Sequence, residues 1–149
     1  MAALNSWRVM ETKAKKVADD AQRDMQTAWN AVNQAQQHWL STQRMHQEYA
    51  QRYQETQERA HRIEDALNQR QFLAQIQRLQ TAALQQLNQA KLTHQQRQRT
   101  HQQAELELHK VRKLVEREEQ KLHAEESRRD QREMDALGVA RHLFNKRAL

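Results

Sequence analysis

The sequence has no proline and no cysteine, and its one glycine is Gly138, close to the C-terminal end. Because proline and glycine are the usual signals for turns, their near absence argues against a compact bundle of several helices. Without cysteine no disulfide bond can form, which fits a reducing compartment. The chain also lacks the run of about 20 apolar residues that a membrane-spanning helix needs. The first residues, MAALNSWRVMETKAKK, have no continuous apolar segment of the kind found in signal peptides, so we expect a cytoplasmic protein without a transmembrane segment.

The residues that are present are mostly polar and favour helices. Only 37% of them are hydrophobic and 30% are charged, and the commonest types have high helix propensity. So little apolar material excludes an ordinary globular core in a chain of 149 residues. The formal charge of +6 favours an acidic partner, either nucleic acid, anionic lipid or an acidic protein surface. A disordered chain is the alternative to a chain of long helices, and the spacing of the apolar residues decides between these two classes.

Apolar residues recur at heptad spacing through the first half of the chain. One register, with core positions a and d, extends from Leu4 to Leu67. Its a positions hold Leu4, Glu11, Ala18, Met25, Val32, Trp39, His46, Tyr53, Ala60 and Leu67, and its d positions hold Trp7, Ala14, Ala21, Ala28, Ala35, Thr42, Tyr49, Thr56 and Ile63. Only Glu11 and His46 are clearly unlike core residues. The pattern therefore predicts a long amphipathic helix, over residues 3–58.

A second register, out of phase with the first, begins at Leu73. Its a positions hold Leu73, Gln80, Leu87, His94, His101, Leu108, Val115 and Leu122, and its d positions hold Ile76, Ala83, Ala90, Arg97, Ala104, Val111 and Glu118. The change of phase between Leu67 and Leu73 indicates a turn within residues 57–68. We expect the second helix over residues 66–145, and a single coiled-coil domain over residues 1–149.

Two narrow apolar stripes joined by a short connection predict an all-α fold, an antiparallel two-helix coiled coil or helical hairpin. Neither stripe is wide enough to stabilise a helix alone, so each needs the other as its partner. The alanines of the first register allow close approach of the two helices, while Trp39, Tyr49 and Tyr53 fill the part nearer the turn. Each paired helix of roughly 55 residues would be about 80 Å long.

The stretch EESRRDQREMDAL, residues 125–137, lies beyond the reach of the first helix. With a turn near residue 62, Leu4 lies opposite residue 120, and the next core positions are the charged Glu125, Arg129 and Arg132. We therefore expect a C-terminal helix overhang, held by helix propensity and by charge pairs such as Glu126 with Arg129. Apolar side chains return at the end of this overhang, and we interpret them as a docking surface for another protein. They are Ala136, Leu137, Val139, Leu143 and Phe144.

A second group of large apolar side chains lies near the expected turn. Met45, Phe72 and Leu79 occupy g positions, outside the strict a/d seam, and they flank Tyr49 and Ile76. These side chains either widen the core or form a second exposed docking site near the turn. Their size at positions outside the seam favours the docking site.

No pattern in the sequence predicts chemistry. His94 and His101 lie one heptad apart, whereas metal ligands on a helix need a spacing of three or four residues and a third ligand, so we expect polar layers in the coiled coil instead. There is no glycine-rich phosphate loop and no serine nucleophile with a base, and two packed helices offer no concave pocket. We expect no enzyme and no catalytic, metal or cofactor-binding residues.

Direct binding of nucleic acid is also disfavoured. Arg128, Arg129 and Arg132 form the densest basic group of the overhang, but acidic residues interrupt it. A helix that binds nucleic acid usually carries an undiluted basic block. We expect these charges to form a solvated helix face, and no nucleic-acid partner.

Three segments combine the features described above: QRMHQEYAQRY (Gln43–Tyr53), NQRQFLAQI (Asn68–Ile76) and EESRRDQREMDAL (Glu125–Leu137). Together, and at their spacing, they resemble the FliJ family of flagellar export proteins. The most specific part is DQREMD, residues 130–135. Ala136 stands where glutamate is common in that family, and the glycine often found at the turn is missing. These departures leave open the related stalk protein of a virulence type III secretion system.

The resemblance implies an antiparallel coiled coil that serves as the central stalk of a hexameric export ATPase, and it implies no cofactor. It places the overhanging end in the ATPase ring and the turn end at the membrane export gate protein, with export chaperones as further partners, peripherally at the inner membrane. The implied ring contacts are Leu4, Trp7, Met10, Arg128, Arg129, Asp130, Gln131, Met134, Asp135, Leu137, Val139, Leu143 and Phe144. The implied gate contacts are Met45, Tyr49, Phe72, Ile76 and Leu79.

A rival hypothesis makes the chain a coiled-coil scaffold or adaptor without an ATPase partner. In one form of it, a single continuous helix of some 220 Å pairs in parallel with a second copy. The stalk hypothesis predicts two antiparallel helices that pair within one chain. This rival predicts helices of two chains that pair in parallel.

Overall fold

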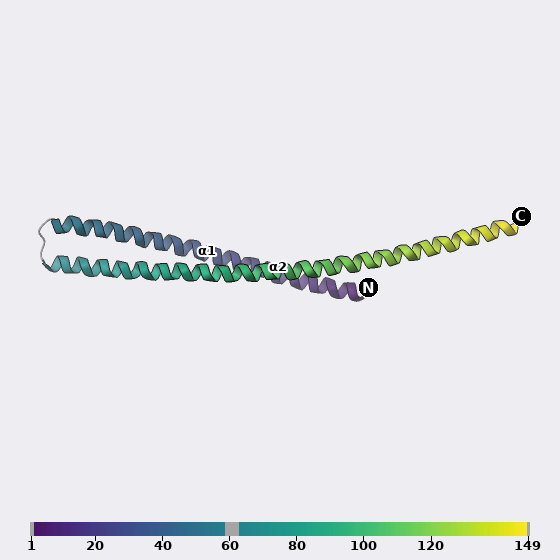
Figure 1. Ribbon diagram of the computed structural model, residues 1–149, viewed down its shortest axis with the longest axis horizontal. Coiled ribbons are helices and arrows are strands. Elements are labelled where there is room, and N and C mark those ends of the chain that lie inside the picture. Colours follow the sequence, from purple (N-terminus) through teal and green to yellow (C-terminus); the bar gives the residue numbers. More distant parts are fainter. Residues whose placement is uncertain (1, 59–62, 149) are drawn as a thin grey trace. The chain divides into compact units, whose positions relative to one another are not determined.

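The computed structural model describes residues 2–58 and 63–148, and every one of them is helical. Helix α1 comprises Ala2–Glu58 and helix α2 comprises Ile63–Ala148 (Figure 1). The two helices pack against each other in antiparallel directions, which confirms the predicted all-α helical hairpin. A single continuous helix paired in parallel with another copy is therefore excluded. The window expected for the turn, 57–68, includes residues 59–62, which lie outside the described residues, as does Ala60 of the first register.

The hairpin divides into two compact units. One unit contains the beginning of α1, up to Ala18, and the part of α2 from Gln103 onward. The other unit runs from Asp19 to Gln102 and so contains the end of α1 and the beginning of α2. In each unit a stretch of α1 is buried against a stretch of α2.

Burial along α1 follows the predicted register closely. Buried or half-buried side chains occupy the predicted a and d positions from Leu4 to Thr56, and only Gln43 and Ala50 are added to them. Several of the buried residues are small, among them Ala18, Ala21 and Ala28. Small residues at these positions let the backbones of the two helices approach closely. Thr42 is also buried, and its hydroxyl donates a hydrogen bond to the carbonyl oxygen of Trp39 (2.6 Å).

The two poorly suited core positions of α1 each lie beside a polar side chain of α2. In the first unit, Glu11 lies 3.7 Å from the guanidinium of Arg112. In the second unit, Nε2 of His46 lies 3.5 Å from the amide nitrogen of Gln77. A partly buried polar group costs free energy unless it has such a partner. These pairs explain how the seam accommodates Glu11 and His46.

In α2 the second register begins earlier than predicted, and the first register ends earlier. Ile63 is 81% exposed and Leu67 is 51% exposed, so their assignment to the core is wrong. Half-buried Ala66 and Gln69 instead occupy the a and d positions one heptad before Leu73 and Ile76. The first register does not continue into α2, because a new helix sets its own phase. Arg97, at a predicted d position, is exposed because its long charged side chain reaches solvent.

Candidate partner-binding sites

The end of α2 forms the largest uncovered part of the first unit. Within that unit, Leu4 is buried and Arg8 makes an ion pair with Glu119 (3.3 Å), so the beginning of α1 lies beside this part of α2. Of the residues that the structure describes, Leu122 is the last half-buried one, and every residue from 123 to 148 is exposed. We call residues 123–148 the exposed segment. At about 1.5 Å per residue, this segment is roughly 40 Å of helix that α1 does not cover, which confirms the predicted overhang.

Large apolar side chains gather in the second half of the exposed segment. Leu137 is 65% exposed and Phe144 is 74% exposed, and Met134, Val139 and Leu143 are similarly open to solvent. At about 100° per residue, Met134, Leu137 and Phe144 share one face of the helix within about 80° of arc, whereas Val139 and Leu143 lie outside that face. Exposed apolar side chains grouped on one arc, on a helix without a partner, are typical of a docking surface.

The first half of the exposed segment is charged, but its charges do not pair with each other. No ion pair joins the described side chains of residues 125–135, so the expected pair between Glu126 and Arg129 is absent. The segment contains two hydrogen bonds of i,i+4 spacing, His123 to Ser127 and Gln131 to Asp135, both 3.2 Å long. Exposed ion pairs gain little free energy in water, which explains why these side chains stay apart. Helix propensity therefore maintains this part of α2.

The three N-terminal residues of the implied ring contacts differ in exposure. Leu4 is buried and Trp7 is half-buried, because both lie in the seam with α2. Met10, one position outside the seam, is exposed. Of the three, Met10 presents the most surface to a partner, while Leu4 and Trp7 fix the start of α1 against α2.

In the second unit, Tyr49 and Phe72, two of the side chains implied as gate contacts, form an aromatic pair between α1 and α2. The rings of Tyr49 and Phe72 meet edge to face, with 4.6 Å between their centroids, an arrangement that stabilises aromatic pairs. Phe72 and Leu79 are exposed on α2, and Met45 is exposed on α1 one turn before Tyr49. Ile76 is buried and supports the cluster from the core. We call Met45, Tyr49, Phe72 and Leu79 the aromatic cluster.

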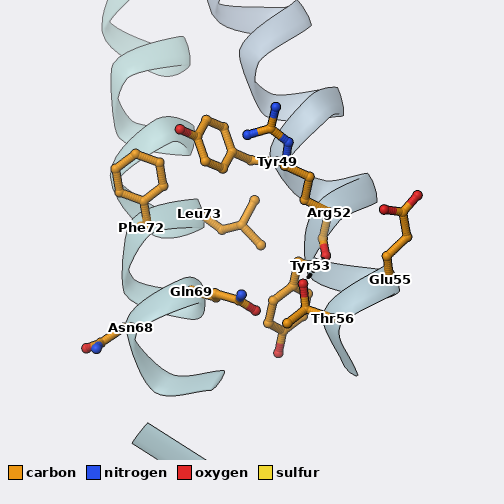
Figure 2. Close-up of a pocket in the computed structure, with 9 residues that line it drawn as sticks. All are labelled: Tyr49, Arg52, Tyr53, Glu55, Thr56, Asn68, Gln69, Phe72 and Leu73. Atoms are coloured by element: carbon orange, nitrogen blue, oxygen red, sulfur yellow. Dashed lines mark hydrogen bonds between the residues drawn. The ribbon is translucent and has the colours of Figure 1, made fainter. Parts of the chain in front are cut away.

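A groove of about 490 Å³ opens beside this cluster, between the end of α1 and the beginning of α2 (Figure 2). Tyr49, Phe72 and Leu73 form its apolar part. The guanidinium of Arg52 lies 5.6 Å from the centre of the Tyr49 ring, and Nε of Arg70 donates a hydrogen bond to the Tyr53 hydroxyl (3.1 Å). The expectation that two packed helices offer no concave pocket is wrong here.

The described residues contain neither a membrane-spanning segment nor a metal-ligand cluster. Neither helix has a stretch both long and apolar enough to cross a bilayer. No three His, Asp or Glu side chains of the described ranges lie close enough together to hold a metal ion. The ring of His94 packs against that of Trp29, with 5.2 Å between the centroids. His94 therefore contributes to the contact between α1 and α2.

Comparison with known proteins assigns the chain to a family. The model of the family described as "Flagellar FliJ protein" matches residues 9–148, nearly the whole chain. No curated protein and no solved structure shows significant similarity. The match covers both helices and includes the exposed segment and the aromatic cluster. Proteins of this family are non-catalytic coiled coils associated with the flagellar export apparatus. The chain therefore belongs to the FliJ family and has a role in flagellar type III protein export.

Proposed function

We propose that the chain is the non-enzymatic central stalk of the export ATPase and couples the ATPase ring to the export gate. The observation that carries this proposal is the exposed segment, a helix end with large exposed apolar side chains and no partner within its unit. A helix end of this kind can enter the pore of a hexameric ring without displacing the rest of the coiled coil. The ring contacts would come from Met10, Arg128, Arg129, Asp130, Gln131, Met134, Asp135, Leu137, Val139, Leu143 and Phe144, with Leu4 and Trp7 holding α1 behind them.

The charge pattern of the exposed segment supports contacts that can be broken and remade. Acidic and basic side chains alternate through residues 125–135, and no ion pair within 4.0 Å joins the described ones to each other. Apart from Asp135, which accepts a hydrogen bond from Gln131, these side chains are therefore available to a charge of the pore wall. Exposed ion pairs are weak, on the order of 0–1 kcal/mol each, so no single ATPase subunit would hold the stalk firmly. The stalk can then move between subunits as they hydrolyse ATP in turn.

The aromatic cluster supports a contact with the membrane export gate protein. Met45, Tyr49, Phe72 and Leu79 present apolar and aromatic surface, and Ile76 fixes the backbone of α2 beneath them. Aromatic side chains dominate the binding energy of many protein interfaces. A stalk that holds the ring by one set of residues and the gate by another would connect ATP hydrolysis to export.

Export chaperones complete the set of proposed partners, and the complex would lie in the cytoplasm against the inner membrane. The family membership supports this part of the proposal.

The substitution Phe72→Ala tests the gate contact. It removes an exposed ring that touches Tyr49, and we expect binding of the gate protein to weaken by about tenfold, the effect of losing one interface aromatic. Stimulation of the ATPase should persist, because the exposed segment is unchanged. Titration of the gate protein by calorimetry, together with an ATP hydrolysis assay, measures both effects.

Leu92→Ala is the matched control, since Leu92 is also an exposed apolar residue of α2 in the same unit. It should change neither activity. Equal loss of gate binding, ATPase stimulation and helicity in Phe72→Ala would instead show that Phe72 acts only in folding.

A further inference from the structure

The exposed segment carries a heptad seam of its own, different from the seam that packs against α1. Ser127, Asp130, Met134, Leu137, Arg141 and Phe144 follow each other at alternating steps of three and four residues and therefore share one face of α2. All six are exposed. A face with two apolar residues at its centre and opposite charges on either side can match a second helix of the same sequence.

The match arises when two copies lie antiparallel. If Met134 of one copy meets Leu137 of the other, the same register places Asp130 opposite Arg141 of the second copy. Two-fold symmetry repeats both contacts, because an interface of this kind uses the same patch on each chain. Phe144 then meets the small Ser127 of the second copy, which leaves room for its ring. The pairing thus buries the apolar centre and joins opposite charges on both sides of it.

Charges beside the seam agree with the same register. Glu126 and Arg147 occupy flanking positions that face each other across an antiparallel pair of helices. In the part of the chain that the structure describes, no ion pair involves Glu126, Asp130, Arg141 or Arg147. All four are therefore available to a second copy. In a parallel pair through the same seam, Asp130 would face Asp130 and Arg141 would face Arg141, so a parallel pair would oppose like charges.

The length of the exposed segment fits the same pairing. Met134 is as far along the chain from His123 as Leu137 is from Ala148, so the symmetric register is centred on the exposed segment. The overlap would run from His123 to Ala148 on each copy and would stop where α1 begins to cover α2. The hairpin of neither copy would have to open.

We propose that the free chain forms an antiparallel dimer through its exposed segment, with Met134 and Leu137 at the centre and pairs of Asp130 with Arg141 on either side. The dimer covers Met134, Leu137 and Phe144, which the chain would otherwise expose to solvent. It uses part of the surface proposed to enter the ATPase ring, so dimer formation and ring binding exclude each other. This regulatory consequence rests on the proposed function, whereas the dimer itself does not.

Sedimentation equilibrium of the full-length chain, without any partner, tests the dimer. A single pair of helices buries an area at the low end of stable interfaces, so we expect a reversible shift from monomer to dimer mass at about 10–100 μM. The variants Asp130→Arg and Arg141→Glu each place like charges opposite each other twice. Each should weaken dimerisation by about tenfold or more.

The decisive arm mixes these two variants in equal amounts. In the mixed dimer, the arginine introduced at position 130 of the first variant faces the glutamate introduced at position 141 of the second. The unchanged Arg141 of the first variant faces the unchanged Asp130 of the second, so every contact joins opposite charges. The mixture should dimerise about as well as the wild type, whereas neither variant does so alone. Circular dichroism checks that both variants remain helical.

Leu106→Ser is the control for a general loss of exposed apolar surface, because Leu106 is similarly exposed elsewhere on α2. It should leave the dimer unchanged, and Leu137→Ser should abolish it. A monomer mass throughout the concentration range would overturn the proposal. So would a mixture of the two charge variants that associates no better than either one alone. If the chain stays monomeric and still binds the ATPase normally, the dimer is overturned and the proposed stalk function remains intact.

Discussion

Truncation of the chain after residue 124 is expected to abolish stimulation of the export ATPase and to leave the hairpin folded. The truncated chain lacks most of the exposed segment, including the apolar side chains from Met134 to Phe144. Among the described residues that the truncation removes, none is buried or half-buried, because residues 125–148 are all exposed. We expect the truncated chain to stimulate ATP hydrolysis less than about a tenth as much as the full chain does. The reason is that an interface loses most of its affinity when its anchor residues are removed.

Urea unfolding supplies the control for this truncation. The midpoint of unfolding should stay within about 0.3 M of the full-length value, because the buried seam is intact and exposed residues contribute little to stability. Full stimulation by the truncated chain would show that the exposed segment is not the ring contact. A large fall in the midpoint would show that the segment packs against the hairpin after all.

Leu87→Ala is expected to have the largest effect on stability. Leu87 is 3% exposed at an a position of the second unit, so its side chain lies in the buried seam between α1 and α2. Removing a buried leucine side chain leaves a cavity and costs about 2–5 kcal/mol, a large fraction of the free energy of unfolding of a chain with so narrow a core. The free energy of unfolding from urea titration measures the loss.

Leu92→Ala is the control for this substitution, since Leu92 is 54% exposed on the same helix. Its cost should stay below about 0.5 kcal/mol, as for most exposed positions. Similar losses for both variants would mean that the heptad register does not describe the core.

Much of the fold could be predicted from the sequence because burial depends on spacing. The a and d positions from Leu4 to Thr56 are all buried or half-buried, and the exposed stretch after Leu122 follows from the position of the turn. The heptad spacing wrongly predicted that Ile63 and Leu67 are core residues. The pattern of the first helix can be extended along the sequence into α2, although α2 has a different phase. Ala66 and Gln69, which take their place in the seam, are too small or too polar to stand out in a sequence.

The candidate sites were predictable where they depend on side-chain type and position along one helix. Leu137 and Phe144 could be recognised as unpartnered because nothing in the first register reaches them. The groove beside Tyr49 could not be predicted from the sequence, since it depends on the distance between Arg52 of α1 and Gln69 of α2. The missing pair between Glu126 and Arg129 shows a further limit. Spacing makes such a contact possible, but solvent competes for both charges.

Site-specific photo-cross-linking tests the central claim most directly, namely that the exposed segment is the part of the chain that enters the ATPase ring. A photoreactive residue would be placed at Leu137 in one variant and at Leu92 in another, and each would be irradiated with the export ATPase and ATP. Both positions are exposed and apolar, so they differ in location on α2 and not in accessibility. We expect Leu137 to give a cross-link to residues lining the pore of the ring, and Leu92 to give none. Cross-linking from Leu92 but not from Leu137 would contradict the account.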